Sequence, residues 1–299
     1  MDRLEYRCVP EDDGLEVLTL LHREFSLSTN LLRRLKVTDG GIALDGERVT
    51  VRRTVRAGQV LSILREPDSG KLRRVPAAAG ALDVVYEDGD VLILNKPSGL
   101  PVHPSPGHFD GETVGNRVVY YLSRTGQNPT FRAINRLDRG TCGLMTCAKN
   151  QLAAQRLEDQ LAAGTLRRRY HAVVEGIGLP QSGVIDLPIG KAEGVGIRRC
   201  VREDGQRAVT RYRVLDEQNG RTLLELELET GRTHQIRCHL SHLGYPICGD
   251  FMYGTELEGV EGFALCSREL WLTQPTTGEP LHFVLPDPAL FSMLLGGSL

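Results

Sequence analysis

The stretch AINRLDRGTCGL, residues 133–144, contains residue types that could do chemistry. One acid, Asp138, stands between Arg136 and Arg139, and Gly140 and Gly143 follow. A cation within about 4–6 Å favours the ionised form of a carboxylate, and this form acts as a nucleophile or as a base. The stretch predicts either an active-site loop with one essential acid or, more simply, a surface turn with a salt bridge.

Three other segments form a pattern with this stretch. They are NKPSGLPVHP at 95–104, RRRYHAVVEG at 167–176 and LETGRTHQIRCHLSHLGYPICGD at 228–250. Taken with residues 133–144, they resemble the motifs of the RluA-type family of pseudouridine synthases. The family's core motif, roughly His-Arg-Leu-Asp-x-x-Thr-Ser-Gly-Leu, stands here as NRLDRGTCGL at 135–144, and the resemblance covers about residues 82–286.

The resemblance implies isomerisation of uridine within a folded RNA, without a cofactor or an external energy source. In this reaction the base is cut from the ribose, turned and rejoined through a ring carbon. Asp138 matches the family's catalytic aspartate, Tyr170 its active-site tyrosine, and Arg237 the arginine that pairs with the aspartate. Arg136 matches the arginine that helps to displace the target nucleotide.

These residue types suit that chemistry on physical grounds. A uridine in a stem-loop must leave the base stack before a protein reaches its sugar and both faces of its ring. An arginine such as Arg136 can fill the vacated stack and hold phosphate or a neighbouring base. Tyr170 offers a flat apolar surface with a polar tip, and Arg237 offers a positive charge for Asp138. Whether Asp138 attacks the sugar, attacks the ring or removes a sugar proton stays open from the sequence.

The core motif differs from the family's motif at three positions. Asn135 replaces the commoner histidine, Gly140 stands where an acid is frequent, and Cys142 replaces serine. Glycine adds backbone freedom, and a thiol is a weaker hydrogen-bonding group than a hydroxyl. We expect these departures to affect the rate and the rigidity of the loop more than the activity itself.

The sequence predicts that many strands and few helices position these residues. Two apolar runs flank the turn at 87–89, and Asn150 is the expected N-cap of a helix that ends at Gly164. A second helix is indicated by Ile236, Leu240 and Leu243, with Gly244 after its end. Strands are expected at 143–148, 167–175, 208–215 and 222–229 and within 262–285. This order predicts an α+β fold with a mixed, largely antiparallel sheet over residues 81–299, which the resemblance identifies as the pseudouridine synthase fold.

Residues 1–66 form a separate unit in the sequence pattern. Its order is helix, helix, hairpin and strand after a short N-terminal extension, with Ser28 as an N-cap and Asp45-Gly46 as the hairpin turn. The unit resembles the small αL RNA-binding module, and a generic small α/β domain is the alternative. Residues 67–80, rich in Pro, Gly and Ala, are the expected linker to a mobile module.

Charge and cysteine usage exclude several classes of protein. The formal net charge is -2, so a general attraction to nucleic acid is absent, and RNA contacts must come from local arginine clusters. We expect such contacts from Arg136, from Arg167, Arg168 and Arg169 beside Tyr170, and from Arg33, Arg34 and Lys36 in the module. The seven scattered cysteines indicate reduced thiols, no zinc site is expected at Cys238, His239, His242 and Cys248, and no segment resembles a membrane span or a signal peptide.

The sequence therefore predicts a cytoplasmic, monomeric RNA pseudouridine synthase that needs neither metal nor cofactor. Its expected partner is a structured RNA, with large-subunit ribosomal RNA favoured and transfer RNA as the alternative. An RNA-binding or ribosome-assembly factor that has lost catalysis is a rival, against which the intact Asp138, Tyr170 and Arg237 weigh. An unrelated aspartate-dependent hydrolase is a second rival, against which the lack of a metal, triad or phosphate-loop motif weighs.

Overall fold

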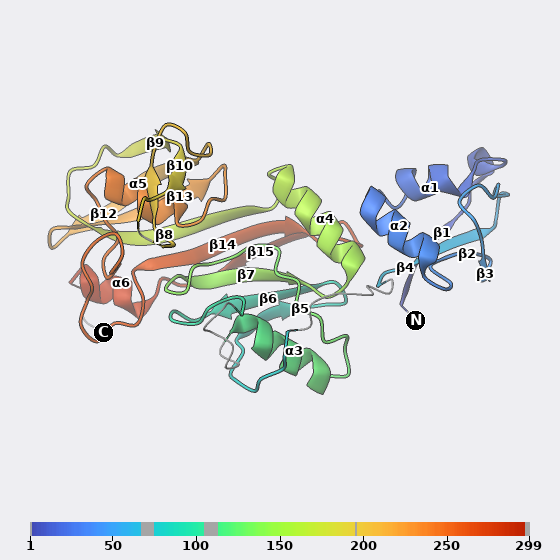
Figure 1. Cartoon of the computed structure of the whole chain (residues 1–299), viewed down its shortest axis with the longest axis horizontal. Helices are drawn as coiled ribbons and strands as arrows, with labels where there is room; N and C mark the ends of the chain where they lie inside the picture. The colour runs from blue at the N-terminus through green and yellow to red at the C-terminus, as the bar shows by residue number, and fades with distance from the viewer. Residues whose placement is uncertain (1, 67–74, 105–112, 195, 297–299) are drawn as a thin grey trace.

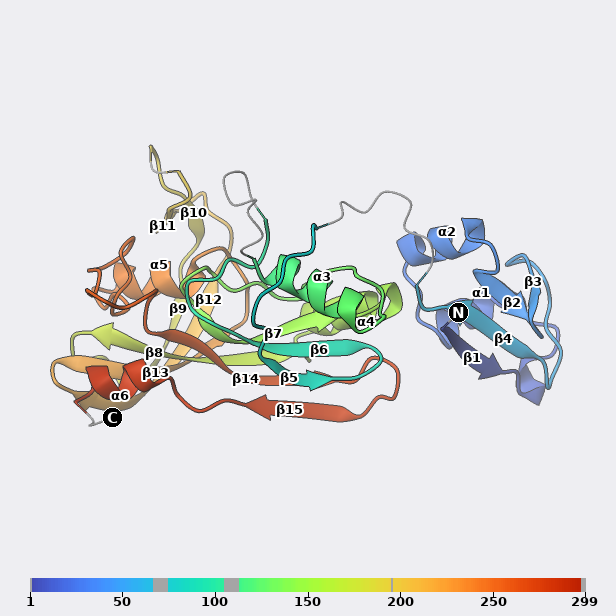
Figure 2. The same ribbon diagram turned by 90° about the horizontal axis from the view of Figure 1, so that it is seen from below.

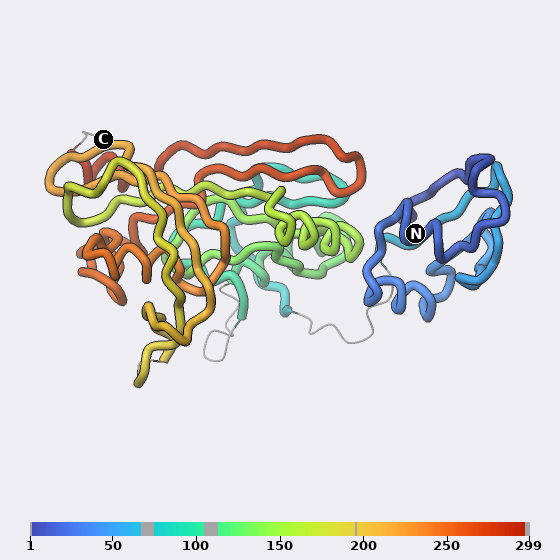
Figure 3. The backbone as a smooth tube through the Cα atoms, turned by 90° about the horizontal axis from the view of Figure 1, so that it is seen from above, coloured from blue at the N-terminus to red at the C-terminus, as the bar shows by residue number. Residues whose placement is uncertain are grey.

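The computed structural model describes residues 2–66, 75–104, 113–194 and 196–296. They form two parts, a small unit of residues 2–66 at one end and a large unit of residues 75–296 (Figures 1 and 3). The expected linker at 67–80 lies partly outside the described residues. Its described end contacts the large unit, because Ala78 N–H donates to Asn116 O and Asn116 Nδ2 donates to Pro76 O.

The small unit packs two helices on a four-stranded antiparallel sheet. The helices are α1 (Val17–Arg23) and α2 (Thr29–Val37), and the sheet order is β1-β4-β2-β3, with β1 at Arg3–Arg7, β2 at Ile42–Leu44, β3 at Glu47–Arg48 and β4 at Val60–Leu64. Ser28 Oγ accepts the Leu31 N–H and so caps α2, as the sequence predicts. Asp45 and Gly46 both have positive φ, as a tight hairpin turn requires.

The N-terminal extension contains a strand, for which the sequence analysis made no prediction. Residues 3–7 form β1, which pairs with β4 from Arg3↔Leu64 to Arg7↔Val60. A 3-10 turn, η1 (Pro10–Asp12), then leads into the first helix. The charged residues of this segment give no apolar strand pattern, because β1 lies at the sheet edge and buries only part of its surface.

The large unit is built on a nine-stranded mixed sheet. Its order is β5-β6-β7-β14-β8-β13-β12-β9, with β15 paired to β14. Among the described strand pairs of this sheet, β7 and β14 are parallel and the others antiparallel. The α+β prediction with a mixed, largely antiparallel sheet is therefore confirmed. The strands are β5 (Val84–Glu87), β6 (Val91–Lys96), β7 (Cys142–Ala148), β8 (Arg167–Glu175), β9 (Ser182–Asp186), β12 (Val209–Gln218), β13 (Arg221–Leu228), β14 (Leu265–Thr273) and β15 (Pro280–Val284).

Four helices and one small hairpin complete the large unit. The helices are α3 (Val114–Arg124), α4 (Gln151–Ala162), α5 (Gln235–His242) and α6 (Ala289–Leu294). Asn150 Oδ1 accepts the Ala153 N–H at the start of α4, and Gly244 has φ 87° just after α5, so both predicted helix ends are confirmed. The hairpin of β10 (Ile189–Lys191) and β11 (Arg199–Val201) projects away from the large sheet beside α5 (Figure 2).

The two units touch through α4. Leu152 of α4 is buried in the apolar core of the small unit, and Gln155 bridges two backbone groups of that unit. Its Nε2 donates to Ser26 O at 2.7 Å, and its Oε1 accepts the Ser28 N–H at 2.7 Å. Arg156 Nη2 donates to Phe25 O at 3.2 Å. The unit expected to be a mobile module therefore rests against α4 in this structure.

Candidate active site

The loop that carries Asp138 is fixed at its end to the centre of the large sheet. Asn135 Oδ1 accepts the Thr146 N–H of β7 at 2.8 Å, and Thr141 N–H donates to Asp138 O at 3.1 Å, closing a turn at the acid. Gly143 has φ 104°, and a Cβ there would lie 2.3 Å from Ser267 O. Only glycine fits where β7 pairs so closely with β14, which holds this end of the loop against the sheet.

Lys96 connects the segment at 95–104 to the same loop. Its side chain is buried, and Nζ donates to the carbonyls of Pro97 at 2.7 Å, Leu100 at 2.8 Å and Arg139 at 3.0 Å. Burial lowers the pKa of Lys96 to about 8. The segment that opens with Lys96 thus holds the backbone of the residue next to Asp138.

Arg237 of α5 reaches across to Asp138, although 99 residues separate the two. Arg237 Nη1 donates to Asp138 Oδ2 at 3.0 Å, and the side chain of Arg237 is only 4% exposed while that of Asp138 is 26% exposed. An arginine so deeply buried needs further partners. The guanidinium also lies over two rings, 5.0 Å from the Tyr253 centroid and 4.4 Å from that of Phe263.

Asp250 supplies the second carboxylate for Arg237. Its Oδ2 accepts from Nε at 2.7 Å and its Oδ1 from Nη2 at 2.8 Å, in a fully buried bidentate pair. Burial opposes the charge of Arg237, but Asp250 and then Asp138 raise the pKa of Arg237 overall. Asp250 ends the segment at 228–250, and its sequence position alone indicates no role for it.

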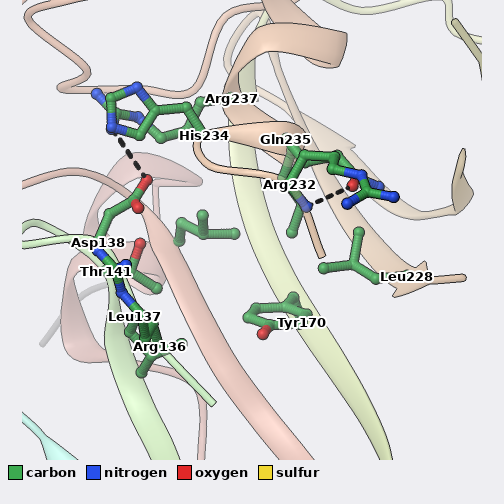
Figure 4. Close-up of a pocket in the computed structure, with 12 residues that line it drawn as sticks. Arg136, Leu137, Asp138, Thr141, Tyr170, Leu228, Arg232, His234, Gln235 and Arg237 are labelled. Carbon is green, nitrogen blue, oxygen red and sulfur yellow. Dashed lines mark hydrogen bonds and ion pairs between the residues drawn. The ribbon is translucent and has the colours of Figure 1, made fainter. Parts of the chain in front are cut away.

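His234 lies beside Arg237 above the Asp138 carboxylate in Figure 4. Its Nε2 is 3.9 Å from Asp138 Oδ2, and its Nδ1 is 3.1 Å from the hydroxyl of Tyr253. Burial lowers the pKa of His234, although Asp138 acts in the opposite direction. His234 also lies in the segment at 228–250, and its sequence position alone indicates no role for it.

Asp138 lines an open pocket with a volume of about 360 Å³, part of which is continuous with solvent. Tyr170 of β8 borders it and is buried, with its ring next to Leu228 in Figure 4. Ile236 and Leu265 add further apolar surface, and the polar lining includes Arg136, Asp138, Thr141, Arg232, His234, Gln235 and Arg237. The pocket combines an apolar wall with one carboxylate held by a cation.

Two of the unusual loop residues have a packing role. A Cβ on Gly140 would lie 2.5 Å from the Phe263 ring, the ring that covers Arg237. Gly140 is buried, and its carbonyl accepts the Ser98 hydroxyl at 2.7 Å. Cys142 Sγ donates to Leu265 O at 3.6 Å. In this structure Gly140 permits a close contact within the site, where the sequence suggested a looser loop.

The sequence model described as RNA pseudouridylate synthase matches residues 90–242 of this chain. Asp138, Tyr170 and Arg237 all fall within that range, and all three line the pocket. The chain belongs to the RluA-type family of RNA pseudouridine synthases. Members of this family are isomerases, so this pseudouridine synthase is an enzyme of that class.

Relatives of this pseudouridine synthase cover nearly its whole length. It is 37% identical over 274 residues to an uncharacterized RNA pseudouridine synthase, YjbO, of Bacillus subtilis, covering 92% of this chain and 96% of the relative. It is also 37% identical to the ribosomal large subunit pseudouridine synthase D of Pseudomonas aeruginosa, over 87% of this chain and 84% of the relative. The structure of human RNA pseudouridylate synthase domain containing 1 is similar, with a TM-score of 0.59 and 27% identity over 73% of this chain and 88% of the human one.

The predicted basic run at 167–169 of the pseudouridine synthase is divided between two faces of the sheet. Successive strand residues point to opposite faces, so Arg168 shares a face with Tyr170 while Arg167 and Arg169 share the other. Both of these lie over the Trp271 ring, at 5.3 and 5.1 Å from its centroid. Strand alternation therefore turns Arg167 and Arg169 away from the pocket, while RNA contact by the three arginines stays a prediction.

The other predicted RNA ligands of the pseudouridine synthase lie in two places. Arg136 is exposed at the pocket, while Arg33 and Lys36 are exposed on α2 of the small unit. Arg34 instead faces the large unit, where its Nη1 donates to Gln151 Oε1 at 2.8 Å. The small unit thus presents Arg33 and Lys36, but not Arg34, on an open face of α2.

In the part of the chain that the structure describes, no group of three or more His, Cys, Asp or Glu side chains is arranged to hold a metal ion. His239 is buried and contacts Thr210 Oγ1 and Leu187 O, both at 2.9 Å. Within the same described ranges, none of the helices combines the length and the apolar character needed to cross a membrane.

Proposed function

We propose that this chain isomerises a uridine in large-subunit ribosomal RNA and that Asp138 is its catalytic group. The observation that carries the proposal is the placement of Asp138 at the pocket, with Arg237 on its Oδ2. Among the described residues, the hydrogen bond to this carboxylate engages Oδ2, which leaves Oδ1 for the substrate. Arg237 places a positive charge beside this half-buried carboxylate.

The pocket suits a pyrimidine that has left its stack. In the reaction the N1–C1′ bond breaks, the C5–C1′ bond forms, and the proton on C5 is replaced by a proton on N1. Tyr170 and Leu228 offer a flat apolar surface for the extruded ring. Asp138 then acts on the sugar or the ring as nucleophile or base. Arg136, exposed at the pocket, occupies the vacated stack or holds a phosphate.

The small unit supports a large structured RNA as the substrate. We propose that it is an αL-type RNA-binding module whose exposed Arg33 and Lys36 contact phosphates. Its contact with α4 sets its position relative to the pocket. Two relatives named ribosomal large subunit pseudouridine synthase D, from Pseudomonas aeruginosa and Xanthomonas campestris, favour ribosomal over transfer RNA.

Position-resolved pseudouridine mapping of total RNA, with and without the protein, tests the proposal. The expected result is a new pseudouridine in large-subunit ribosomal RNA. Modification confined to transfer RNA would contradict the choice of substrate, and no new pseudouridine in any RNA would contradict the function. Deletion of residues 1–66 is expected to weaken binding of large RNA, and unchanged binding would contradict the role of the module.

A further inference from the structure

We propose that His234 is a positioning residue of the reaction, a neutral imidazole whose Nε2–H fixes the orientation of the Asp138 carboxylate. The inference rests on the proposed function, because it assigns a second group to the same carboxylate. Three features of the structure carry it: the facing of His234 and Asp138, the hydrogen bond to Tyr253, and the backbone conformation of His234.

The first feature is the distance between the two side chains. His234 Nε2 lies 3.9 Å from Asp138 Oδ2, the oxygen that accepts from Arg237 Nη1 at 3.0 Å. A gap of 3.9 Å is longer than a hydrogen bond, but catalytic hydrogen bonds are often long in the free enzyme and shorten when substrate binds. Once closed, this contact gives Oδ2 a second donor beside Arg237, and Oδ1 is left for the substrate.

The second feature sets which ring nitrogen of His234 carries the proton. The Tyr253 hydroxyl accepts the Arg199 N–H at 2.8 Å and lies 3.1 Å from His234 Nδ1. Burial raises the pKa of Tyr253 to about 12, so the hydroxyl keeps its proton. Among the described residues, His234 Nδ1 is the acceptor that lies within hydrogen-bond distance of the Tyr253 hydroxyl, so Tyr253 donates to Nδ1. The ring hydrogen of the neutral His234 is then on Nε2, which faces Asp138.

Burial is the main reason that the pKa of His234 is lowered, and the charged groups around the ring act in both directions. Burial and the cations Arg237 and Arg199 lower the pKa of His234, whereas the carboxylates Asp138 and Asp250 raise it, and the net direction is downward. A neutral imidazole with one N–H is a directional donor.

The third feature is a backbone conformation that costs energy. His234 has φ 58°, in the left-handed region that side-chain-bearing residues rarely occupy. Gln235 holds this turn, since its Oε1 accepts from Thr230 Oγ1 and Arg232 N and its Nε2 donates to Val209 O and Thr210 Oγ1. Such strain persists where the surroundings enforce it, and it collects at functional sites. Here it places the imidazole between Tyr253 and Asp138.

Three substitutions separate positioning from a merely structural role. His234→Gln keeps a side chain long enough to present an N–H near the place of Nε2, and His234→Ala removes it. Both pay a similar backbone cost at positive φ. His234→Asn tolerates that φ best but is too short to reach Asp138.

The rates of pseudouridine formation are measured on the RNA that the mapping experiment identifies as the substrate, at saturating and at limiting RNA concentration. We expect His234→Ala and His234→Asn to lose kcat by about 10- to 100-fold, as for loss of a hydrogen bond to a charged group, with KM within about threefold. His234→Gln should recover most of the loss. Equal rates for Ala and wild type, or a fast Asn variant beside a slow Gln variant, would overturn the inference.

The tautomer is measured without RNA, from the 15N chemical shifts of the His234 ring in the free protein. The expected result is an unprotonated Nδ1 and a protonated Nε2, with more of the other tautomer in Tyr253→Phe. A proton on Nδ1 of the wild type would overturn the inference even if the enzyme modifies RNA. Absence of modification by a wild type with the expected tautomer would instead overturn the proposed function.

Discussion

Asp250→Asn tests how far the site depends on the carboxylate behind Arg237. The substitution keeps the shape of the side chain and one acceptor oxygen, but removes the charge and one of the two hydrogen bonds to Arg237. It also leaves the backbone N–H of Met252, which donates to Oδ1 at 3.1 Å, with a weaker or absent partner.

The size of the effect follows from burial. Asp250 is fully buried and Arg237 is 4% exposed, so solvent screens their pairing little. Breaking a buried ion pair costs about 3–5 kcal/mol, and the retained oxygen of Asn favours the lower end. A loss of about 3 kcal/mol corresponds to a fall in Tm of about 5 °C for a chain of 299 residues, at an unfolding entropy of about 2.1 cal/mol/K per residue. If Arg237 also releases Asp138, the lost charge-assisted hydrogen bond of about 1.5–3 kcal/mol lowers kcat by about 10- to 100-fold.

The assay combines thermal unfolding with single-turnover pseudouridine formation at a temperature where the variant is folded. Asp39→Asn is the matched control, because Asp39 also pairs with an arginine, Arg48, but is 98% exposed. The control should match the wild type in both measurements. A variant Asp250→Asn that keeps the wild-type rate within twofold would refute the view that Asp250 positions Arg237 for Asp138.

Two further changes probe the support of the loop. Gly140→Ala should lower Tm and kcat, because its Cβ would lie 2.5 Å from the Phe263 ring. The control Gly231→Ala, with nothing within 4 Å of its Cβ, should leave Tm unchanged. Equal Tm values for both variants would contradict the packing role of Gly140. Burial lowers the pKa of Lys96 from 10.5 to about 8. Between these two pH values the unfolded chain binds a proton at Lys96 that the folded chain does not bind. The free energy of unfolding of the wild type, relative to that of Lys96→Met, should therefore rise from pH 8 towards pH 10.5. Denaturant unfolding of both proteins at several pH values measures that difference, and a constant difference would contradict the buried state of the amine.

The sequence was most informative where local rules decide structure. Ser28 and Asn150 act as the predicted helix caps because an N-cap depends on residues three positions apart. The meeting of Asp138, Tyr170 and Arg237 was predicted from the family resemblance, and the structure brings all three to one pocket. Their individual roles in catalysis stay predictions.

The sequence was least informative where tertiary contacts decide. The strand at 3–7 depends on pairing with β4, and no local pattern in its charged residues indicates that partner. The roles of Asp250 and His234 depend on burial around Arg237 and Asp138, which the spacing of the motif does not show. The separation of Arg167 and Arg169 from Tyr170 follows from simple strand alternation, so that signal was present in the sequence.

Asp138→Asn, tested on the mapped RNA, addresses the central claim most directly. The substitution preserves size and polarity while removing the negative charge that Arg237 holds. The account predicts that this variant forms no detectable pseudouridine and binds the RNA with an affinity within severalfold of the wild type. Continued pseudouridine formation by Asp138→Asn would contradict the assignment of Asp138 as the catalytic group.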